Sequence, residues 1–137
     1  MIQLKSVLNV IDNSGAVLVE CIKVLRNARF ARTGDEIVVA VRQARPISQV
    51  SSKVTSGTSS AGNAQKLRKG DVRRAVIVRT KKELQRPDGR MVRFDDNACV
   101  LVDKGGQPLG TRVLGLVAAE VREKGWPKVV ALAPKVI

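Results

Sequence analysis

The sequence contains no histidine among its 137 residues. Histidine is the commonest general base of enzymes and the commonest metal ligand, so its absence argues against both kinds of site. Cysteine is scarce too, since Cys21 and Cys99 are the only thiols and lie far apart. Each stands in an apolar stretch typical of a strand, which predicts small buried side chains and a reducing compartment. A disulfide between them stays an alternative.

Long hydrophobic runs are also missing. No stretch approaches the roughly 20 apolar residues that cross a bilayer, and no long basic amphipathic helix is visible. Met1 to Leu8 lacks the apolar core of a secretory signal and the arginine-rich pattern of a cleaved transit peptide. The sequence therefore predicts no membrane partner.

Acidic residues are too few to balance the basic ones. Lys and Arg number 25 against 12 Asp and Glu, which gives a net charge of +13 and a pI near 10.7. Such an excess says much about partners and nothing about the fold. Because most of the charges are interspersed among strand-like residues, we expect the partner to be a nucleic acid.

Catalytic and metal-binding patterns are absent as well. Ser14 and Cys99 have no partner base, and the carboxylate pairs Asp35-Glu36 and Asp95-Asp96 fall at turns. The glycine-rich stretch Lys104 to Gly110 lacks the ending of a phosphate-binding loop, and no spacing suggests a metal. We therefore expect no enzyme and no cofactor; a small hydrolase using Asp95 or Asp96 is the weakest alternative.

What is present is a β-rich chain centred on Val72 to Asp103. Val72–Thr80 and Ala98–Val102 are rich in β-branched residues, which predicts strands, and Met91–Phe94 predicts another between them. Pro87-Asp88-Gly89 favours a turn, since proline presets φ and glycine accepts a positive φ. Basic residues flank this apolar stretch: Arg73, Arg74, Arg79, Lys81, Lys82, Arg86, Arg90 and Arg93.

Three earlier strands are predicted at Val7–Ile11, Ala16–Leu25 and Asp35–Arg45. The near-continuous apolar character of Ala16–Leu25 predicts burial on both faces over part of its length. In the third strand Ile37, Val39 and Val41 alternate with residues that become polar. Between the second and third strands, Phe30 lies among arginines, where it either stacks on a base or anchors a solvated loop.

The remaining segments predict a flexible loop and two short helices, which belong to a single domain together with the strands. Ser48 to Asn63 is rich in serine, threonine and glycine, which predicts a flexible inserted loop over about residues 48–65. Ala118–Lys124 favours a helix that stops at Gly125, and Lys128–Ala133 favours a second helix after Pro127. We expect a β-barrel over about residues 1–103 and a small loop-helix part over about 104–137.

Several blocks resemble the universal large-subunit ribosomal protein fourteen family, across most of the chain. They include Asp12-Asn13-Ser14-Gly15-Ala16, Cys21-Ile22-Lys23-Val24, Lys69-Gly70-Asp71-Val72, Ala75 to Lys82, Arg86-Pro87-Asp88-Gly89, Phe94, Asn97, Val100-Leu101, Gly110-Thr111-Arg112 and Leu132-Ala133-Pro134. The resemblance implies a five-stranded β-barrel with a C-terminal loop-helix subdomain. It also implies a structural role in the large ribosomal subunit.

The partners that the resemblance implies are large-subunit rRNA near the sarcin–ricin region, neighbouring large-subunit proteins and small-subunit rRNA across the interface. Ribosome-silencing factor is a further implied partner. Carried to this sequence, the rRNA contacts are Lys23, Arg42, Arg45, Lys69, Arg73, Arg79, Lys81, Lys82, Arg86, Arg90 and Arg93. Charge alone adds Arg26, Arg29, Lys53, Lys66 and Arg68.

Two departures from bacterial members point to the fungal mitochondrial branch. The Ser48–Asn63 segment is longer, and the Gly125-Trp126-Pro127 neighbourhood differs. We therefore predict a mitochondrial location with uncleaved import, with the bacterial cytoplasm as the alternative. A dissociable SH3- or OB-like RNA-binding regulator of translation is the competing function.

Overall fold

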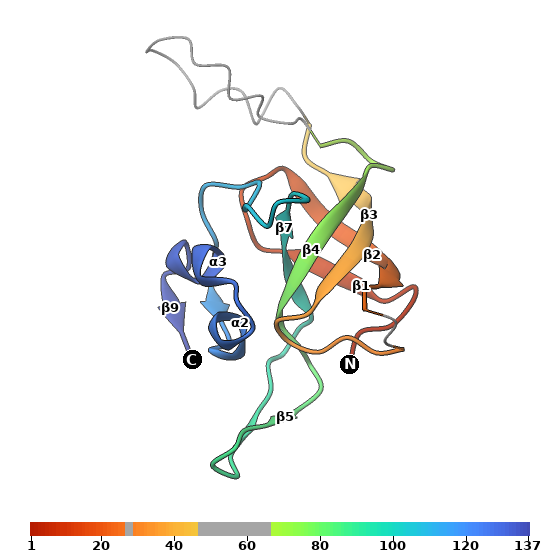
Figure 1. Ribbon diagram of the computed structural model, residues 1–137. Coiled ribbons are helices and arrows are strands. Elements are labelled where there is room, and N and C mark those ends of the chain that lie inside the picture. Colours follow the sequence, from red (N-terminus) through yellow and green to blue (C-terminus); the bar gives the residue numbers. More distant parts are fainter. Residues whose placement is uncertain (27–28, 47–66) are drawn as a thin grey trace.

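The computed structural model describes residues 1–26, 29–46 and 67–137. Its centre is a closed barrel with the strand order β1-β2-β3-β4-β7, which confirms the expected five-stranded barrel (Figure 1). Neighbouring strands are antiparallel except where β7 pairs in parallel with β1 and closes the barrel. The strands are β1 (Val7–Val10), β2 (Ala16–Val24), β3 (Glu36–Ala44), β4 (Val72–Arg79) and β7 (Ala98–Val102).

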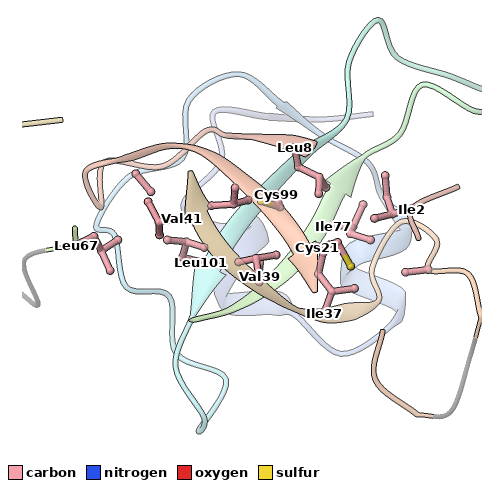
Figure 2. Close-up of a cluster of buried hydrophobic side chains, with 14 residues drawn as sticks. Ile2, Leu8, Cys21, Ile37, Val39, Val41, Leu67, Ile77, Cys99 and Leu101 are labelled. Atoms are coloured by element: carbon pink, nitrogen blue, oxygen red, sulfur yellow. The ribbon is translucent and has the colours of Figure 1, made fainter. Parts of the chain in front are cut away.

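The barrel interior is filled by every second residue of its strands. Ile37, Val39 and Val41 of β3 point inward and are buried, whereas Arg42 is exposed, as the alternation predicted. Figure 2 shows these three side chains in one buried cluster with Cys99 and Leu101 of β7. A core this apolar holds the barrel together without a metal or a disulfide.

Both cysteines belong to that interior. Cys21 and Cys99 are buried free thiols, so the predicted packing role is confirmed and the alternative of a disulfide is wrong. Burial raises the pKa of each thiol. Because only the thiolate is strongly nucleophilic, both side chains are chemically quiet.

A second apolar layer lies outside the barrel, between the strands β4 and β7 and the C-terminal part of the chain. Val76 and Val78 of β4, and Val100 and Val102 of β7, pack there against residues such as Val121. The covering elements are β8 (Leu116–Val117), α2 (Glu120–Glu123), α3 (Pro127–Ala131) and β9 (Lys135–Val136). Figure 1 shows them in blue beside β7.

The two-sided burial predicted over part of Ala16–Leu25 is limited to the beginning of β2, where no residue from Ala16 to Cys21 is exposed. In β2 the side chain of Ile22 is 40% exposed, and Lys23 is also exposed. All five residues of β7 are buried instead, because the C-terminal part covers β7 and β4 and leaves β2 uncovered. The C-terminal end of the chain does supply a second layer, but on β4 and β7 instead of β2.

The predicted strand Met91–Phe94 does not join the barrel. Its first half forms β6 (Met91–Val92), which pairs with β5 (Leu84–Gln85) in a separate hairpin that projects from the barrel (Figure 1). Met91 is 57% exposed, so this short segment has too little buried surface to compete for a place in the barrel. The hairpin turns at Gly89, whose φ of 87° fits the turn chemistry of the sequence.

The C-terminal helices are shorter than predicted, but α2 ends and α3 begins at the expected signal. Pro127 starts α3, and Gly125, with a φ of 91°, follows α2. No helix within the described ranges is long and apolar enough to cross a membrane. The inserted loop predicted at 48–65 lies wholly outside the described residues, in the stretch 47–66.

Candidate nucleic-acid interface

The barrel separates the predicted RNA-binding residues into two groups. β3 and β4 are antiparallel, with Glu36 opposite Val76 and Ala40 opposite Val72. At the hairpin end, where β4 ends and the β5–β6 hairpin begins, lie Lys23, Arg26, Arg29, Arg79, Lys81, Lys82, Arg86, Arg90 and Arg93. At the opposite end, where β3 ends and β4 begins, lie Arg42, Arg45, Arg68, Lys69 and Arg73. Lys53 and Lys66 lie outside the described residues.

Exposed cations at the hairpin end stand on a backbone that is fixed by hydrogen bonds. The Lys81 N–H donates to Asn97 Oδ1 at 2.9 Å, and the Phe94 N–H donates to the Thr80 carbonyl at 3.0 Å. Lys81, Arg93 and Lys23 form no ion pair with any residue that the structure describes. These three side chains are therefore cationic, exposed and available to an external anion.

Two other arginines of the hairpin end turn toward the protein. The side chain of Arg79 is only 16% exposed, and its Nη2 donates to Asp96 Oδ2 at 3.1 Å. Gly115 lies so close that a Cβ on it would stand 3.2 Å from Arg79 Nη1. Arg86 is 19% exposed and paired with Glu120. Since carboxylates already bind both guanidinium groups, these arginines have less capacity for phosphate than their charge suggests.

The hairpin also carries two exposed pairs between near neighbours. Lys82 Nζ lies 2.6 Å from Glu83 Oε1, and Arg90 Nε lies 2.6 Å from Asp88 Oδ2. The hydrogen bonds from Arg90 hold the pKa of the Asp88 carboxyl below its usual range. Exposed pairs of this kind contribute little to stability, so a phosphate can replace the carboxylate without unfolding the hairpin.

At the opposite end, backbone hydrogen bonds again fix the segments that carry the basic side chains. The Arg45 N–H donates to the Gly15 carbonyl at 2.7 Å, and the Arg68 N–H donates to Asp71 Oδ2 at 2.9 Å. Arg45, Arg68 and Lys69 are exposed, whereas Arg73 is half-buried with Nη2 4.0 Å from Asp71. Arg42 is exposed but pairs with Glu20 on β2.

The burial of Asp12 was not predicted from the sequence: this residue is 2% exposed and lies between the barrel and the C-terminal part. Asp12 accepts hydrogen bonds from the Ser14 N–H and the Leu101 N–H, both at 3.0 Å, and from the Ser14 hydroxyl. Burial nevertheless raises the pKa of this carboxyl. Asp12 therefore ties the turn after β1 to the middle of β7, and has a structural rather than a binding role.

Two sequence blocks that lie far apart in the chain meet beside Asp12. Asn13 Oδ1 accepts from the Thr111 N–H at 2.7 Å and from the Arg112 N–H at 3.2 Å. Gly110 packs so tightly that an added Cβ would stand 2.6 Å from Asn13 Oδ1. The glycine is thus required by the close approach of the C-terminal loop to the turn after β1.

The C-terminal part also presents exposed basic side chains, which lie outside both groups of predicted contacts. They include Lys104, Arg112, Arg122, Lys128 and Lys135. Except for Arg112, which stands in a block that carries the family resemblance, charge was the only signal for them in the sequence. In the described ranges no group of three or more histidine, cysteine or acidic residues could hold a metal ion. The chemistry that the two groups at the barrel ends offer is the binding of anions.

Comparison with known proteins agrees with this picture. The family described as "Ribosomal protein L14p/L23e" matches residues 1–137. The protein named "Large ribosomal subunit protein uL14m" from Schizosaccharomyces pombe is 53% identical over 137 residues, covering 100% of both chains. The protein of the same name from Neurospora crassa is 50% identical over 134 residues, covering 98% of both chains.

These relatives confirm the predicted fungal mitochondrial branch, because both are fungal proteins with the mitochondrial name uL14m. The family also decides between the functional classes that the sequence left open, since its members are structural components of ribosomes and not enzymes. With a match over its whole length, this chain belongs to the ribosomal protein L14p/L23e family.

Proposed function

We propose that this protein is a structural component of the large subunit of the mitochondrial ribosome and binds large-subunit rRNA. Membership of the family supports the ribosomal role, and the names of the two fungal relatives support the mitochondrion. The observation that carries the rRNA contact is the set of exposed cations on a hydrogen-bonded frame at the hairpin end, above all Lys81 and Arg93.

The mechanism is electrostatic and geometric. Rigid strands present ammonium and guanidinium groups to phosphates, and each contact releases counterions from the RNA. Arginine can also grip a phosphate with two parallel hydrogen bonds, which makes Arg93 and Arg45 the more specific contacts. Phe30, which is 45% exposed, is free to stack on a base.

We test this with the full chain and a fluorescent fragment of large-subunit rRNA, measuring affinity by anisotropy across a salt series. The Lys81→Ala/Arg93→Ala double variant should bind more weakly and reduce the log–log salt slope by about 1.5 to 2. The matched control is Arg122→Ala/Lys135→Ala, which removes the same charge from the C-terminal part. An unchanged salt slope in Lys81→Ala/Arg93→Ala would refute a contact at the hairpin end.

The same proposal predicts how firmly the protein is held in the particle. A core component should sediment with the large subunit of mitochondrial ribosomes after a wash at high salt. Release by a moderate-salt wash would support the dissociable regulator instead. The experiment uses native ribosomes and needs no variant.

Finer partners also belong to the proposal and rest on the family resemblance. They are neighbouring large-subunit proteins, small-subunit rRNA across the subunit interface and ribosome-silencing factor. Crosslinking of native mitochondrial ribosomes, followed by identification of the crosslinked partners, tests each of them separately.

A further inference from the structure

The β5–β6 hairpin has few attachments of its own to the barrel. Each of its strands has two residues, and the pairing is limited to Leu84 with Val92 and Gln85 with Met91. On the side of the N-terminal residues, a groove of about 700 Å³ lined by Met1 and Thr33 opens beneath the hairpin. Leu84 and Met91 line this groove instead of packing into a core, so apolar contacts on that side do not fix the hairpin.

On the side of the C-terminal part, Arg86 connects the hairpin to the rest of the protein by hydrogen bonds. Arg86 Nε donates to Glu120 Oε1 at 2.7 Å, and Arg86 Nη2 reaches Glu120 Oε2 at 3.4 Å. The same Nη2 donates to the Ile137 carbonyl at 2.6 Å. The side chains of Arg86 and Glu120 are 19% and 14% exposed, so solvent screens this pair less than the other pairs of the hairpin.

Both ends of this connection are firmly placed. Arg86 opens the hairpin turn, where its N–H donates to the Arg90 carbonyl at 2.8 Å and its carbonyl accepts from the Gly89 N–H at 3.0 Å. Glu120 precedes Val121, which is fully buried in the outer apolar layer. The Ile137 carbonyl is held by the Ala119 N–H at 2.8 Å. The C-terminal part therefore fixes the position of the hairpin tip through Arg86.

We propose that Arg86 and Glu120 are positioning residues that hold the hairpin in the orientation in which its exposed cations, Lys82 and Arg90, meet rRNA. This inference rests on the proposed function. It assigns a supporting role in RNA binding to an acidic residue that no charge argument would select. It also moves Arg86 from the predicted phosphate contacts to the frame that supports them.

The proposal predicts that Glu120→Gln changes RNA affinity in the direction opposite to that expected from net charge alone. Glu120→Gln raises the net charge by one, so electrostatics alone predicts tighter binding to RNA. If the pair positions the hairpin, the variant must order one or two extra residues when it binds, and its affinity falls by about two- to tenfold. The matched control is Glu123→Gln, which makes the same charge change on the same helix but has no ion pair among the described residues.

The experiment reads order and affinity separately in the full chain. Order is the ¹⁵N heteronuclear NOE of the Gly89 amide in the free protein, and affinity is measured with the fluorescent rRNA fragment. Glu120→Gln should lower both, whereas Glu123→Gln should leave the order unchanged and bind at least as tightly. An unchanged NOE at Gly89 in Glu120→Gln, or a lowered NOE without loss of affinity, would overturn the proposal.

A reciprocal exchange guards against a trivial loss of folding. Arg86→Glu/Glu120→Arg keeps the net charge and restores an ion pair between the same positions, so order and most of the affinity should return. If affinity stayed low while the NOE recovered, Arg86 would be a phosphate ligand and the positioning role would be wrong. If the wild-type protein bound no rRNA while Glu120→Gln still loosened Gly89, the proposed function would fall and the positioning of the hairpin would stand.

Discussion

The two walls of the barrel differ in what lies outside them. In the covered wall, made of β4 and β7, the C-terminal part packs on the outer face, and Val76 and Val100 are as buried as the inward residues. In the bare wall, made of β2 and β3, the outward positions carry Glu20, Ile22 and Arg42, of which Ile22 and Arg42 are exposed and Glu20 is half-buried. The inner faces of both walls are equally apolar.

This difference decides where basic side chains can stand. In β4 the four central residues are apolar and buried, and Arg73, Arg74 and Arg79 occupy only its ends. A guanidinium group in the middle of the covered wall would lie in a dry layer without a partner, at high cost. Basic side chains are therefore excluded from the middle of the covered wall. They stand at the barrel ends and on the hairpin, where the candidate interface lies.

The largest difference in stability between the two walls should come from replacing one outward valine on each wall by alanine. Val100→Ala should lower the free energy of unfolding by about 1.5 to 3 kcal/mol, because two methyl groups leave a filled apolar layer and a cavity remains. The matched Val38→Ala variant removes the same atoms from the half-buried outer side of β3 and should cost less than about 1 kcal/mol. Urea unfolding measures both.

Equal losses for these two variants would show that the C-terminal part contributes no real packing layer. A loss in Val100→Ala that appeared only in the C-terminal amides, by hydrogen exchange, would show that the layer opens without the barrel. That outcome would divide the molecule into two stability units and sharpen the contrast between its walls.

A smaller effect should come from Asp12, which joins the turn after β1 to the covered wall. Asp12→Asn should lower the free energy of unfolding by about 1 to 2 kcal/mol in acid, because the amide can no longer satisfy both the Ser14 N–H and the Leu101 N–H. Measurement is by urea unfolding of both proteins between about pH 4 and 8.

The difference in unfolding free energy between wild type and Asp12→Asn should change with pH in a definite direction. Burial raises the pKa of Asp12 in the folded state above its ordinary value of 3.8. The stability that protonated Asp12 contributes is therefore fully present below pH 3.8 and is lost as the pH rises through the raised folded pKa. The gap between wild type and Asp12→Asn should narrow with rising pH, and a gap that widened would mean that the pKa is lowered.

Much of the barrel could be predicted from the sequence because its signals are local. Alternation at Ile37, Val39 and Val41 identifies the inner face of β3, and Pro87-Asp88-Gly89 identifies the hairpin turn. The structure confirms both. Such patterns depend on neighbours in the chain and need no knowledge of what packs against them.

What the sequence could not supply were the contacts between distant segments. Ala16–Leu25 and β7 are both apolar runs, and nothing in either run tells which strand is buried on both faces. The C-terminal part decides this by packing on β7. Arg86 and Glu120 stand 34 residues apart. An arginine at a turn therefore resembles a free cation in the sequence, although in the fold it is held by a carboxylate.

The smallest effect concerns the ion pair on the bare wall. Glu20→Gln removes the carboxylate beside Arg42, whose side chain is 58% exposed, and should change the free energy of unfolding by less than about 1 kcal/mol. Because Arg42 then has no competing carboxylate, RNA affinity should rise, opposite in sign to Glu120→Gln, and Arg42→Gln should lower it. Anisotropy with the rRNA fragment measures all three. Weaker binding by Glu20→Gln would mean that acidic side chains position cations on both walls, and the contrast between them would no longer explain where the interface lies.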